Sequence, residues 1–225
     1  KYFHWELEFA DIFELNSGFD LILGNPPWLK VEWQEGGVMG DFEPKFILKK
    51  LSASNLNAIR AQTFEQHPKL ERAYLNEFSE SEGTQNFLNA MTNYPELKGI
   101  QTNLYKCFLP LGWEISSSSG IAAYVHPEGI YDDPRGGGFR EEVYKRLRMH
   151  CQYQNEFQLF VGTNDHGRMK FGTHIYCNAV NEIGFLSINN LYTPSTLGDC
   201  FDSSKLLETV PGIKNEHGKW NTKGH

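Results

Sequence analysis

Four consecutive residues, Asn25-Pro26-Pro27-Trp28, are the part of this chain best suited to chemistry. An aromatic exocyclic amine is a poor nucleophile because its lone pair is delocalised into the ring. Two acceptors on its N–H groups, the Asn25 side-chain oxygen and the Pro26 carbonyl, would localise that pair. Trp28 would offer a face for a base to stack on, a contact worth roughly 1–3 kcal/mol. The four residues therefore predict group transfer to an amine, with all four in the catalytic turn.

The residues before this turn must position it. Residues 19–23 are bulky and apolar except for Asp20, which is typical of a strand buried on both faces of a parallel sheet. Gly24 frees the backbone, and the two prolines lack amide donors, so the strand cannot continue beyond Asn25. Open α/β sheets bind ligands at the carboxyl ends of their strands. A plain strand-to-loop turn is the alternative interpretation, since Asn-Pro and Pro-Pro are frequent in loops.

The strand and turn together resemble motif IV, [DNS]PP[YFW], of S-adenosylmethionine-dependent amino-methyltransferases. They are most similar to DNA adenine-N6 methyltransferases of the gamma motif order, and among these to the large methylases of type IIG restriction-modification enzymes and of phage-defence systems such as BREX and DISARM. The resemblance implies an α/β fold: the C-terminal half of a Rossmann-like methyltransferase sheet, with a helical insertion. Release-factor glutamine methyltransferases share the tetrapeptide, so the tetrapeptide alone does not determine whether the substrate is DNA or protein.

Two further segments resemble cofactor-binding motifs. Alternating apolar residues predict a strand over residues 3–9, and Asp11 beyond it resembles the acidic residue of motif III, which binds the adenine amine of the cofactor. A solvated turn aspartate is the alternative. Residues 103–113 resemble the helix of motif V, in which Tyr105 and Phe108 are the candidates for cofactor binding, although core packing explains most of its apolar face.

The base-binding candidates come from a segment that resembles motif VIII, residues 171–180. There Phe171 would face Trp28 across an extruded base, and His174 falls at a polar position of the same pocket. The alternative is an edge strand whose phenylalanine fills the core. His126 and Glu128 follow another apolar strand and resemble motif VI. We interpret them as the pocket edge, because methyl transfer from a sulfonium does not need a strong base first.

The cofactor-binding half of the site is expected elsewhere. No G-x-G-x-x-G motif occurs in the chain, so we expect the main S-adenosyl-L-methionine motif upstream of residue 1, in a longer protein whose isolated fragment is inactive. We predict a partial methyltransferase domain over residues 1–185 with an insertion at about 29–101. Residues 186–225 would be a linker or the start of a target-recognition domain.

Charge and composition limit the partners and the location. The net charge of −7 does not favour DNA binding, so either the basic surface lies outside this chain or the substrate is not DNA. We favour the first. No segment approaches the ~20 apolar residues of a membrane span, and no signal peptide is visible. We therefore predict a cytoplasmic protein without membrane association.

Metal chemistry is not expected from the sequence. The cysteines are widely spaced and form no Cys-x-x-Cys pair, which indicates reduced core thiols. His166, His174 and Cys177 lie close together, but no fourth ligand stands at a familiar zinc spacing. We therefore predict no metal site.

The predicted function is methylation of adenine N6 in double-stranded DNA, in restriction-modification or phage defence, with fused or associated restriction or defence subunits as partners. Two alternatives stay open. One is methylation of a protein glutamine at N5, and the other is a non-catalytic module that positions DNA.

Overall fold

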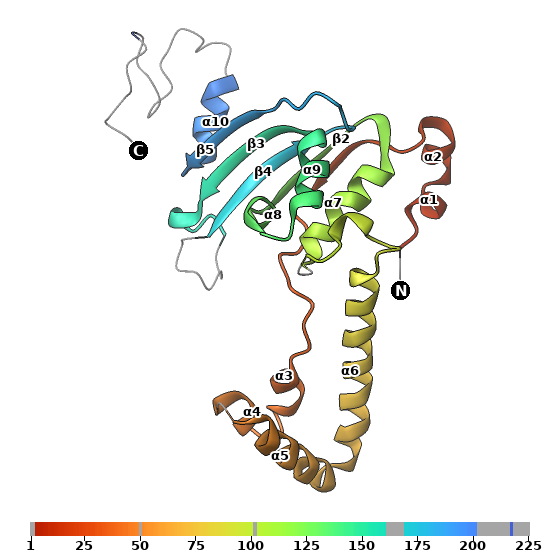
Figure 1. Ribbon diagram of the computed structural model, residues 1–225, viewed down its shortest axis with the longest axis vertical. Helices are drawn as coiled ribbons and strands as arrows, with labels where there is room; N and C mark the ends of the chain where they lie inside the picture. Colours follow the sequence, from red (N-terminus) through yellow and green to blue (C-terminus); the bar gives the residue numbers. More distant parts are fainter. Residues whose placement is uncertain (1–2, 50, 101–102, 161–168, 202–216, 218–225) are drawn as a thin grey trace. The chain divides into compact units, whose positions relative to one another are not determined.

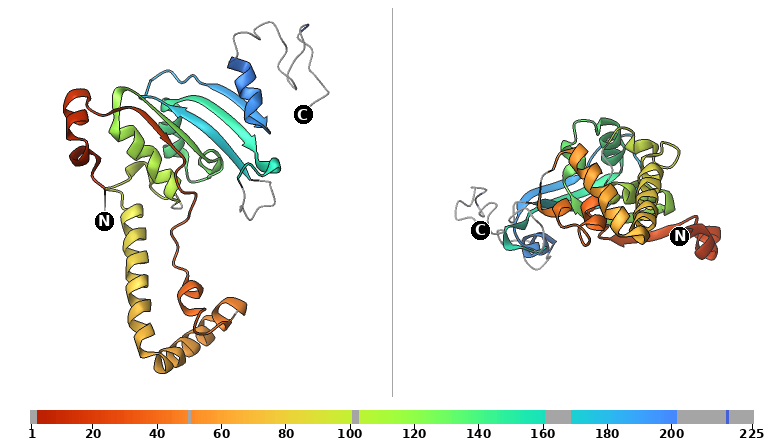
Figure 2. Two further views of the ribbon diagram at one scale, coloured as in Figure 1. Left: turned by 180° about the vertical axis from the view of Figure 1, so that it is seen from behind. Right: turned by 90° about the horizontal axis from the view of Figure 1, so that it is seen from below.

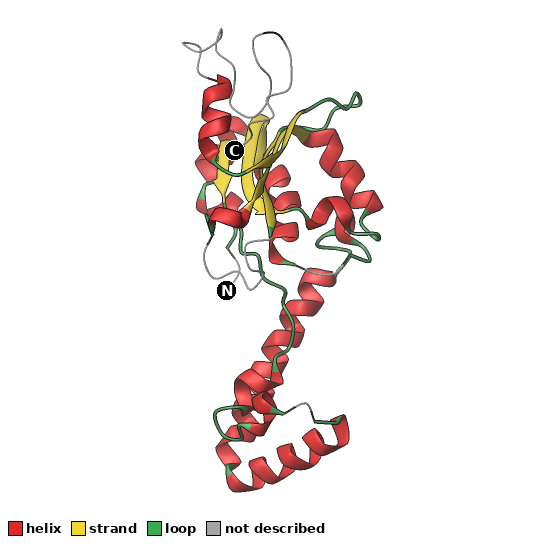
Figure 3. Ribbon diagram, turned by 90° about the vertical axis from the view of Figure 1, so that its left-hand side faces the viewer, coloured by secondary structure: helices red, strands yellow, loops and turns green. Residues whose placement is uncertain are grey.

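A computed structural model describes residues 3–49, 51–100, 103–160, 169–201 and 217. The chain divides into two compact units, one made of residues 1–28 and 108–225 and the other of residues 29–107. The first unit contains a sheet flanked by helices (Figures 1 and 3). Its strands are β1 (Phe19–Gly24), β2 (Ser116–Pro127), β3 (Leu147–Gln154), β4 (Lys170–Tyr176) and β5 (Leu186–Leu191). Its helices are α1 (Trp5–Glu8), α2 (Ala10–Asn16), α8 (Gly129–Asp132), α9 (Gly137–Arg146) and α10 (Pro194–Phe201), with a 3₁₀ turn at Asn155–Phe157.

The sheet is mixed, and in the described residues it has five strands in the order β1-β2-β4-β3-β5. β1 runs parallel to β2, and β3 runs parallel to β5. β4 is antiparallel to both of its neighbours. This arrangement confirms the predicted α/β class and is consistent with a Rossmann-like methyltransferase sheet. Because β5 pairs with β3, the sheet extends past residue 185, where we expected the catalytic domain to end.

The two faces of the sheet are covered differently. Helices α8 and α9 lie over one face (Figure 1), where Phe139 and Val143 of α9 are fully buried. The opposite face has a cluster of Cys151, Tyr153, Phe171 and Leu191, and Leu197 packs against it. Leu197 belongs to α10, which Figure 2 shows from two further sides. Side chains that follow one another along a strand point to opposite faces, so β4 contributes Phe171 to one face and His174 to the other.

The expectation that β1 is buried on both faces is wrong for the described chain. β1 is an edge strand, with β2 as its partner in the sheet. The side chains of Leu21 and Leu23 are 58% and 71% exposed. The apolar run predicted the strand correctly, but burial depends on the elements that pack against it, and in the described residues those elements leave these two leucines open.

The predicted strand over residues 3–9 is also wrong, because the segment forms α1 and leads into α2. Trp5 and Phe9 are four residues apart and stack with ring centroids 6.0 Å apart. Phe9 and Phe13 both contact Phe19 of β1, at 5.3 Å and 5.6 Å between ring centroids. Positions 5, 9 and 13 are four residues apart and share one face of a helix. Within the predicted strand, positions 5 and 9 also fit the alternation of a strand. The aromatic cluster over Phe19 therefore favours the helix.

The second unit is helical. Its helices are α3 (Glu35–Met39), α4 (Lys45–Leu48), α5 (Ala53–Gln66) and α6 (Pro68–Asn89), followed by a 3₁₀ turn at Pro95–Leu97. Met39, Leu70 and Tyr74 form its core. Helix α7 (Leu104–Ile115) begins in this unit and ends in the first. Its position confirms the helix expected over residues 103–113, whereas the role of residues 29–101 as an insertion stays a prediction.

The fold shows where the four cysteines lie. Of the four thiols, Cys107 and Cys151 are buried, but Cys177 is partly exposed and Cys200 is exposed, so core thiols were predicted correctly only for the first two. Burial raises the pKa of Cys107 to about 11.

Among the helices of the described residues, none has the length and apolar character needed to cross a membrane.

Gly18 sets the entry into β1, and its replacement by alanine is expected to destabilise the protein. Its φ of +142° disfavours any side chain, and a Cβ would lie 2.6 Å from the Ile115 carbonyl oxygen. We expect Gly18→Ala to cost about 2 kcal/mol, which lowers the thermal midpoint by roughly 4–8 °C. Gly184→Ala is the matched control, because a Cβ there meets no atom within 4 Å. Equal midpoints for the two variants would contradict this account.

Candidate active site

The Asn25-Pro26-Pro27-Trp28 turn begins where β1 ends at Gly24, as the prolines predict. Gly24 pairs with Tyr124 of the parallel neighbour β2, and a Cβ on it would lie 3.1 Å from the Tyr124 ring. Pro26 is buried and anchors the turn, while Asn25 is exposed. The amide side chain is therefore presented at the carboxyl end of a parallel strand, the edge at which α/β sheets bind ligands.

An apolar pocket of about 390 Å³ opens beside this turn. Its volume is within the range of small-molecule sites. The pocket is lined by β1, the first three residues of the turn, Trp5, Tyr124 and the α7 residues Phe108, Leu111, Gly112 and Ile115. Burial raises the pKa of Tyr124 to about 12, so its hydroxyl stays neutral at physiological pH. A Cβ on Gly112 would lie 2.0 Å from that hydroxyl, so glycine leaves the space for Tyr124.

The predicted cofactor residues do not all reach this pocket. Phe108 lines it together with Asn25. Tyr105 belongs to the second unit, is buried, and is not among the lining residues. Asp11 lies in α2, exposed, and not at the strand tip expected for it. Of the three, only Phe108 is therefore placed beside the Asn-Pro-Pro-Trp turn by the described structure.

Trp28 lies in an aromatic cluster on the sheet face opposite α8 and α9. Its Nε1–H donates to the Val125 carbonyl at 3.2 Å. Its ring centroid lies 5.0 Å from that of Phe160 and 6.0 Å from that of Phe171. The structure thus brings Trp28 and Phe171 into contact, while their placement on either side of a base stays a prediction. Phe160 was not anticipated, because nothing in the local sequence separates it from the neighbouring apolar residues.

The two predicted base platforms are in mutual contact. A base held between parallel rings needs roughly 7 Å between their planes, two van der Waals separations. The rings of Trp28 and Phe171 are inclined by 31°, and Phe171 is only 4% exposed. In this arrangement Phe171 supports Trp28, and a base between them requires the rings to separate.

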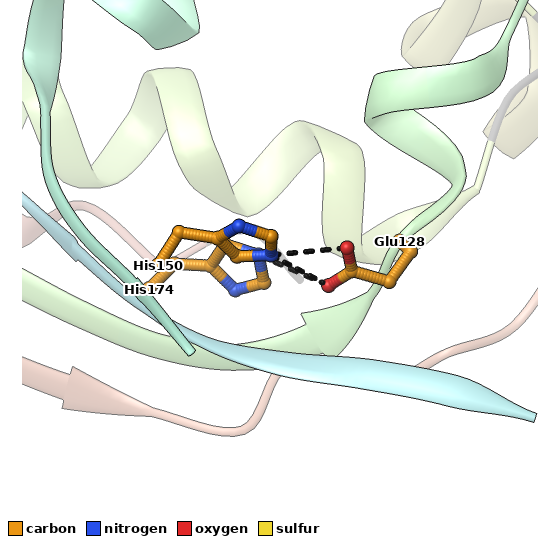
Figure 4. A group of neighbouring side chains, drawn as sticks. All are labelled: Glu128, His150 and His174. Atoms are coloured by element: carbon orange, nitrogen blue, oxygen red, sulfur yellow. Dashed lines mark hydrogen bonds and ion pairs between the residues drawn. The ribbon is translucent and has the colours of Figure 1, made fainter. Parts of the chain in front are cut away.

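His174 does not join the aromatic cluster. It pairs with His150 of β3 and with Tyr124 of β2. Its ring stacks on that of Tyr131 in α8, so it faces the side of the sheet that α8 and α9 cover. Its position three residues after Phe171 explains the separation, since an odd spacing along a strand reverses the face. The structure instead places His174 beside His150 and Glu128, at the end of β2 (Figure 4).

The fold and the turn together define the class of site: a mixed α/β sheet in which an Asn-Pro-Pro-Trp turn borders an apolar pocket at the carboxyl end of a strand. Residues 1–72, less than half of the chain, match the Eco57I restriction-modification methylase family. That segment includes β1 and the whole turn. Over it the chain is similar to restriction-modification methylases.

Comparison with whole proteins adds little. No curated protein matches the chain. Among solved structures, the ATP-dependent Type ISP restriction-modification enzyme LlaBIII bound to DNA is similar over 89% of this chain, at 13% identity and a TM-score of 0.39. That TM-score is too low to carry an argument. The chain spans 12% of the length of that enzyme.

Proposed function

We propose that the protein containing this chain transfers a methyl group from S-adenosylmethionine to the N6 amine of adenine in DNA, as the methylase of a restriction-modification or phage-defence system. The observation that carries the proposal is the Asn25 turn, held at the end of β1 and bordering a pocket that also contains Phe108. The family match over residues 1–72 supports it, since it covers the same strand and turn.

The chemistry assigned to the turn is positioning and polarisation. The Asn25 Oδ1 and the Pro26 carbonyl would accept the two N–H bonds of the adenine amine, and so direct its lone pair at the methyl group. Preorganised groups of this kind are usually the largest electrostatic contribution to catalysis. Prolines at 26 and 27 serve this task because their fixed φ angles hold the acceptors without loss of entropy at each turnover.

The substrate base would be held by stacking on Trp28. Stacking of this kind offsets part of the few kcal/mol that extrusion of a base from the duplex costs. Phe108, which lines the pocket, is the candidate for contact with the cofactor. S-adenosylmethionine supplies the electrophilic methyl group when it is bound. The remaining cofactor contacts, and the basic surface that a chain of net charge −7 does not offer, are expected in other parts of the protein.

The test is product analysis with the full-length protein that contains these residues. Incubation with labelled S-adenosylmethionine and unmethylated DNA, followed by digestion to nucleosides, is expected to place the label in N6-methyladenosine. Label found in protein glutamine instead would favour the glutamine alternative. Cofactor binding without transfer to DNA or protein would favour the non-catalytic positioning module.

A further inference from the structure

Glu128, His150 and His174, here called the His-Glu cluster, come from three elements of the sheet unit (Figure 4). His150 on β3 and His174 on β4 are directly paired, so their side chains leave the sheet on the same face. Glu128 follows the last residue of β2 and caps α8. Its carboxylate lies 3.0 Å from His150 Nε2 and 3.5 Å from His174 Nε2.

The cluster is shielded from solvent. The side chains of Glu128 and His150 are 11% and 10% exposed, and that of His174 is fully buried. Among the described residues, neither ring nitrogen of His174 has a partner with hydrogen-bond geometry. A buried polar atom without a partner destabilises the folded state, because it has lost its hydrogen bonds to water and gained none in return. The arrangement is therefore incomplete as a hydrogen-bonded core network.

Gly172 provides the space for the cluster. A Cβ at this position would lie 2.5 Å from Glu128 Oε1 and 2.6 Å from His174 Cε1. Any side chain there would displace the carboxylate from the two imidazoles. Its partner on β3 is Gln152, whose amide donates to Glu128 Oε2 at 3.2 Å. The backbone thus leaves open the volume in which the three donor atoms converge.

Burial alone would raise the pKa of Glu128, but the adjacent imidazoles of His150 and His174 outweigh it and hold that pKa well below its ordinary value. Burial lowers the pKa of His174, although the nearby carboxylate opposes this.

The donor spacing also suits a metal ion. In a tetrahedral site with bonds of about 2.0–2.2 Å, neighbouring donor atoms are roughly 3.3 Å apart. Glu128 Oε1 lies 3.1 Å from His150 Nε2 and 3.5 Å from His174 Nε2, on either side of that value. All three ligand atoms lie within 4.8 Å of one another.

We propose that Glu128, His150 and His174 bind one divalent transition-metal ion, with zinc the best match, which ties the end of β2 to β3 and β4. Two imidazoles and a carboxylate are a familiar protein ligand set for zinc, with a water molecule in the fourth position. The sequence-based expectation of no metal failed to find this set because it considered His174 only with its near neighbours. His166, one of those neighbours, lies outside the described residues.

Neighbouring groups orient the ligands, as in known metal sites. Ser187 on β5 pairs with His150, and its Oγ lies 3.4 Å from His150 Nδ1, which leaves Nε2 for the metal. The His126 ring stacks on His174 with centroids 3.6 Å apart. Both nitrogens of His126 are already used, by the Pro127 carbonyl at 2.8 Å and the Tyr176 hydroxyl at 2.9 Å. His126 therefore positions His174 and is not itself a ligand.

The test measures metal binding by the full-length protein after removal of metal with a chelator. Titration with zinc is expected to show one tight site that involves these residues and to raise the thermal midpoint. Cobalt in the same site should give the visible d–d bands of a low-coordinate centre. Glu128→Gln, His150→Gln and His174→Gln should each weaken zinc binding at least about 100-fold, by analogy with the large effects of lost metal-site contacts. His67→Gln is the control, since His67 is an exposed histidine of the other unit.

A variant that keeps all three ligands guards against loss of folding. Gly172→Ala should also weaken zinc binding, because its methyl group occupies the space of the carboxylate, while Gly184→Ala should bind as the unmodified protein does. Circular dichroism in chelator establishes which variants are folded. If zinc neither binds stoichiometrically nor raises the midpoint of the unmodified protein, or if the folded ligand variants bind it equally well, the cluster is a buried ion-pair network and the proposal is overturned.

Discussion

Replacement of Asn25 by alanine is expected to lower the rate constant of methyl transfer by about 10²–10³-fold, the usual effect of removing one preorganised electrostatic contact from a transition state. The reason is that the variant keeps only the Pro26 carbonyl as an acceptor for the amine. Because Asn25 is exposed at the end of β1, the loss of its side chain should leave the fold unchanged. Single-turnover transfer of labelled methyl groups to DNA measures the rate constant directly.

Two matched variants sharpen this prediction. Asn25→Asp keeps an oxygen acceptor in the same place and is expected to retain more activity than the alanine variant. Asn57→Ala removes an equally exposed amide from α5 in the other unit and should transfer at the unmodified rate. Cofactor affinity should be nearly equal in all of them, since Asn25 is assigned to the substrate amine. Transfer by Asn25→Ala at the unmodified rate would remove the chemical basis of the proposed function.

The parts of the fold that the sequence predicted are those with strong local signals. The end of β1 follows from the two prolines, and α7 follows from one apolar face of helical spacing. The strand predicted over residues 3–9 was wrong because the aromatic residues of this segment fit both an alternating pattern and helical spacing. Local pattern also could not predict the exposure of Leu21 and Leu23, which depends on the position of β1 at the edge of the described sheet.

The candidate sites show the same limit. Asn25 was assigned to the catalytic turn and Phe108 to cofactor binding from resemblance, and the structure places both around one pocket. The His-Glu cluster was not recognised, because sheet register brings together residues that are 22 positions apart, Glu128 and His150, with His174 further along. His174 was assigned to the base pocket from its neighbours in sequence, but its strand position directs it to the other face of the sheet. Long-range register is thus the information that the local patterns lack.

Trp28→Ala is expected to raise the KM for DNA by about 5–150-fold, the equivalent of the roughly 1–3 kcal/mol that base stacking contributes. The variant also loses the hydrogen bond to the Val125 carbonyl and the contacts with Phe160 and Phe171. Trp28→Phe separates these effects, because it keeps an aromatic face but has no N–H donor. It should recover most of the affinity for DNA.

Steady-state methylation of DNA by these variants, beside Phe157→Ala as an exposed aromatic control, distinguishes the substrates. In the adenine mechanism, KM for DNA follows the size of the aromatic face at position 28, and the control leaves it unchanged. A protein glutamine has no ring to stack, so a glutamine methyltransferase would lose activity in Trp28→Ala only through the altered packing of the turn. In that case the KM for DNA would not depend on the aromatic face that Trp28→Phe retains. If KM for DNA is the same in Trp28→Ala and the unmodified protein, Trp28 is a structural residue of the aromatic cluster, and the base must be held by other groups.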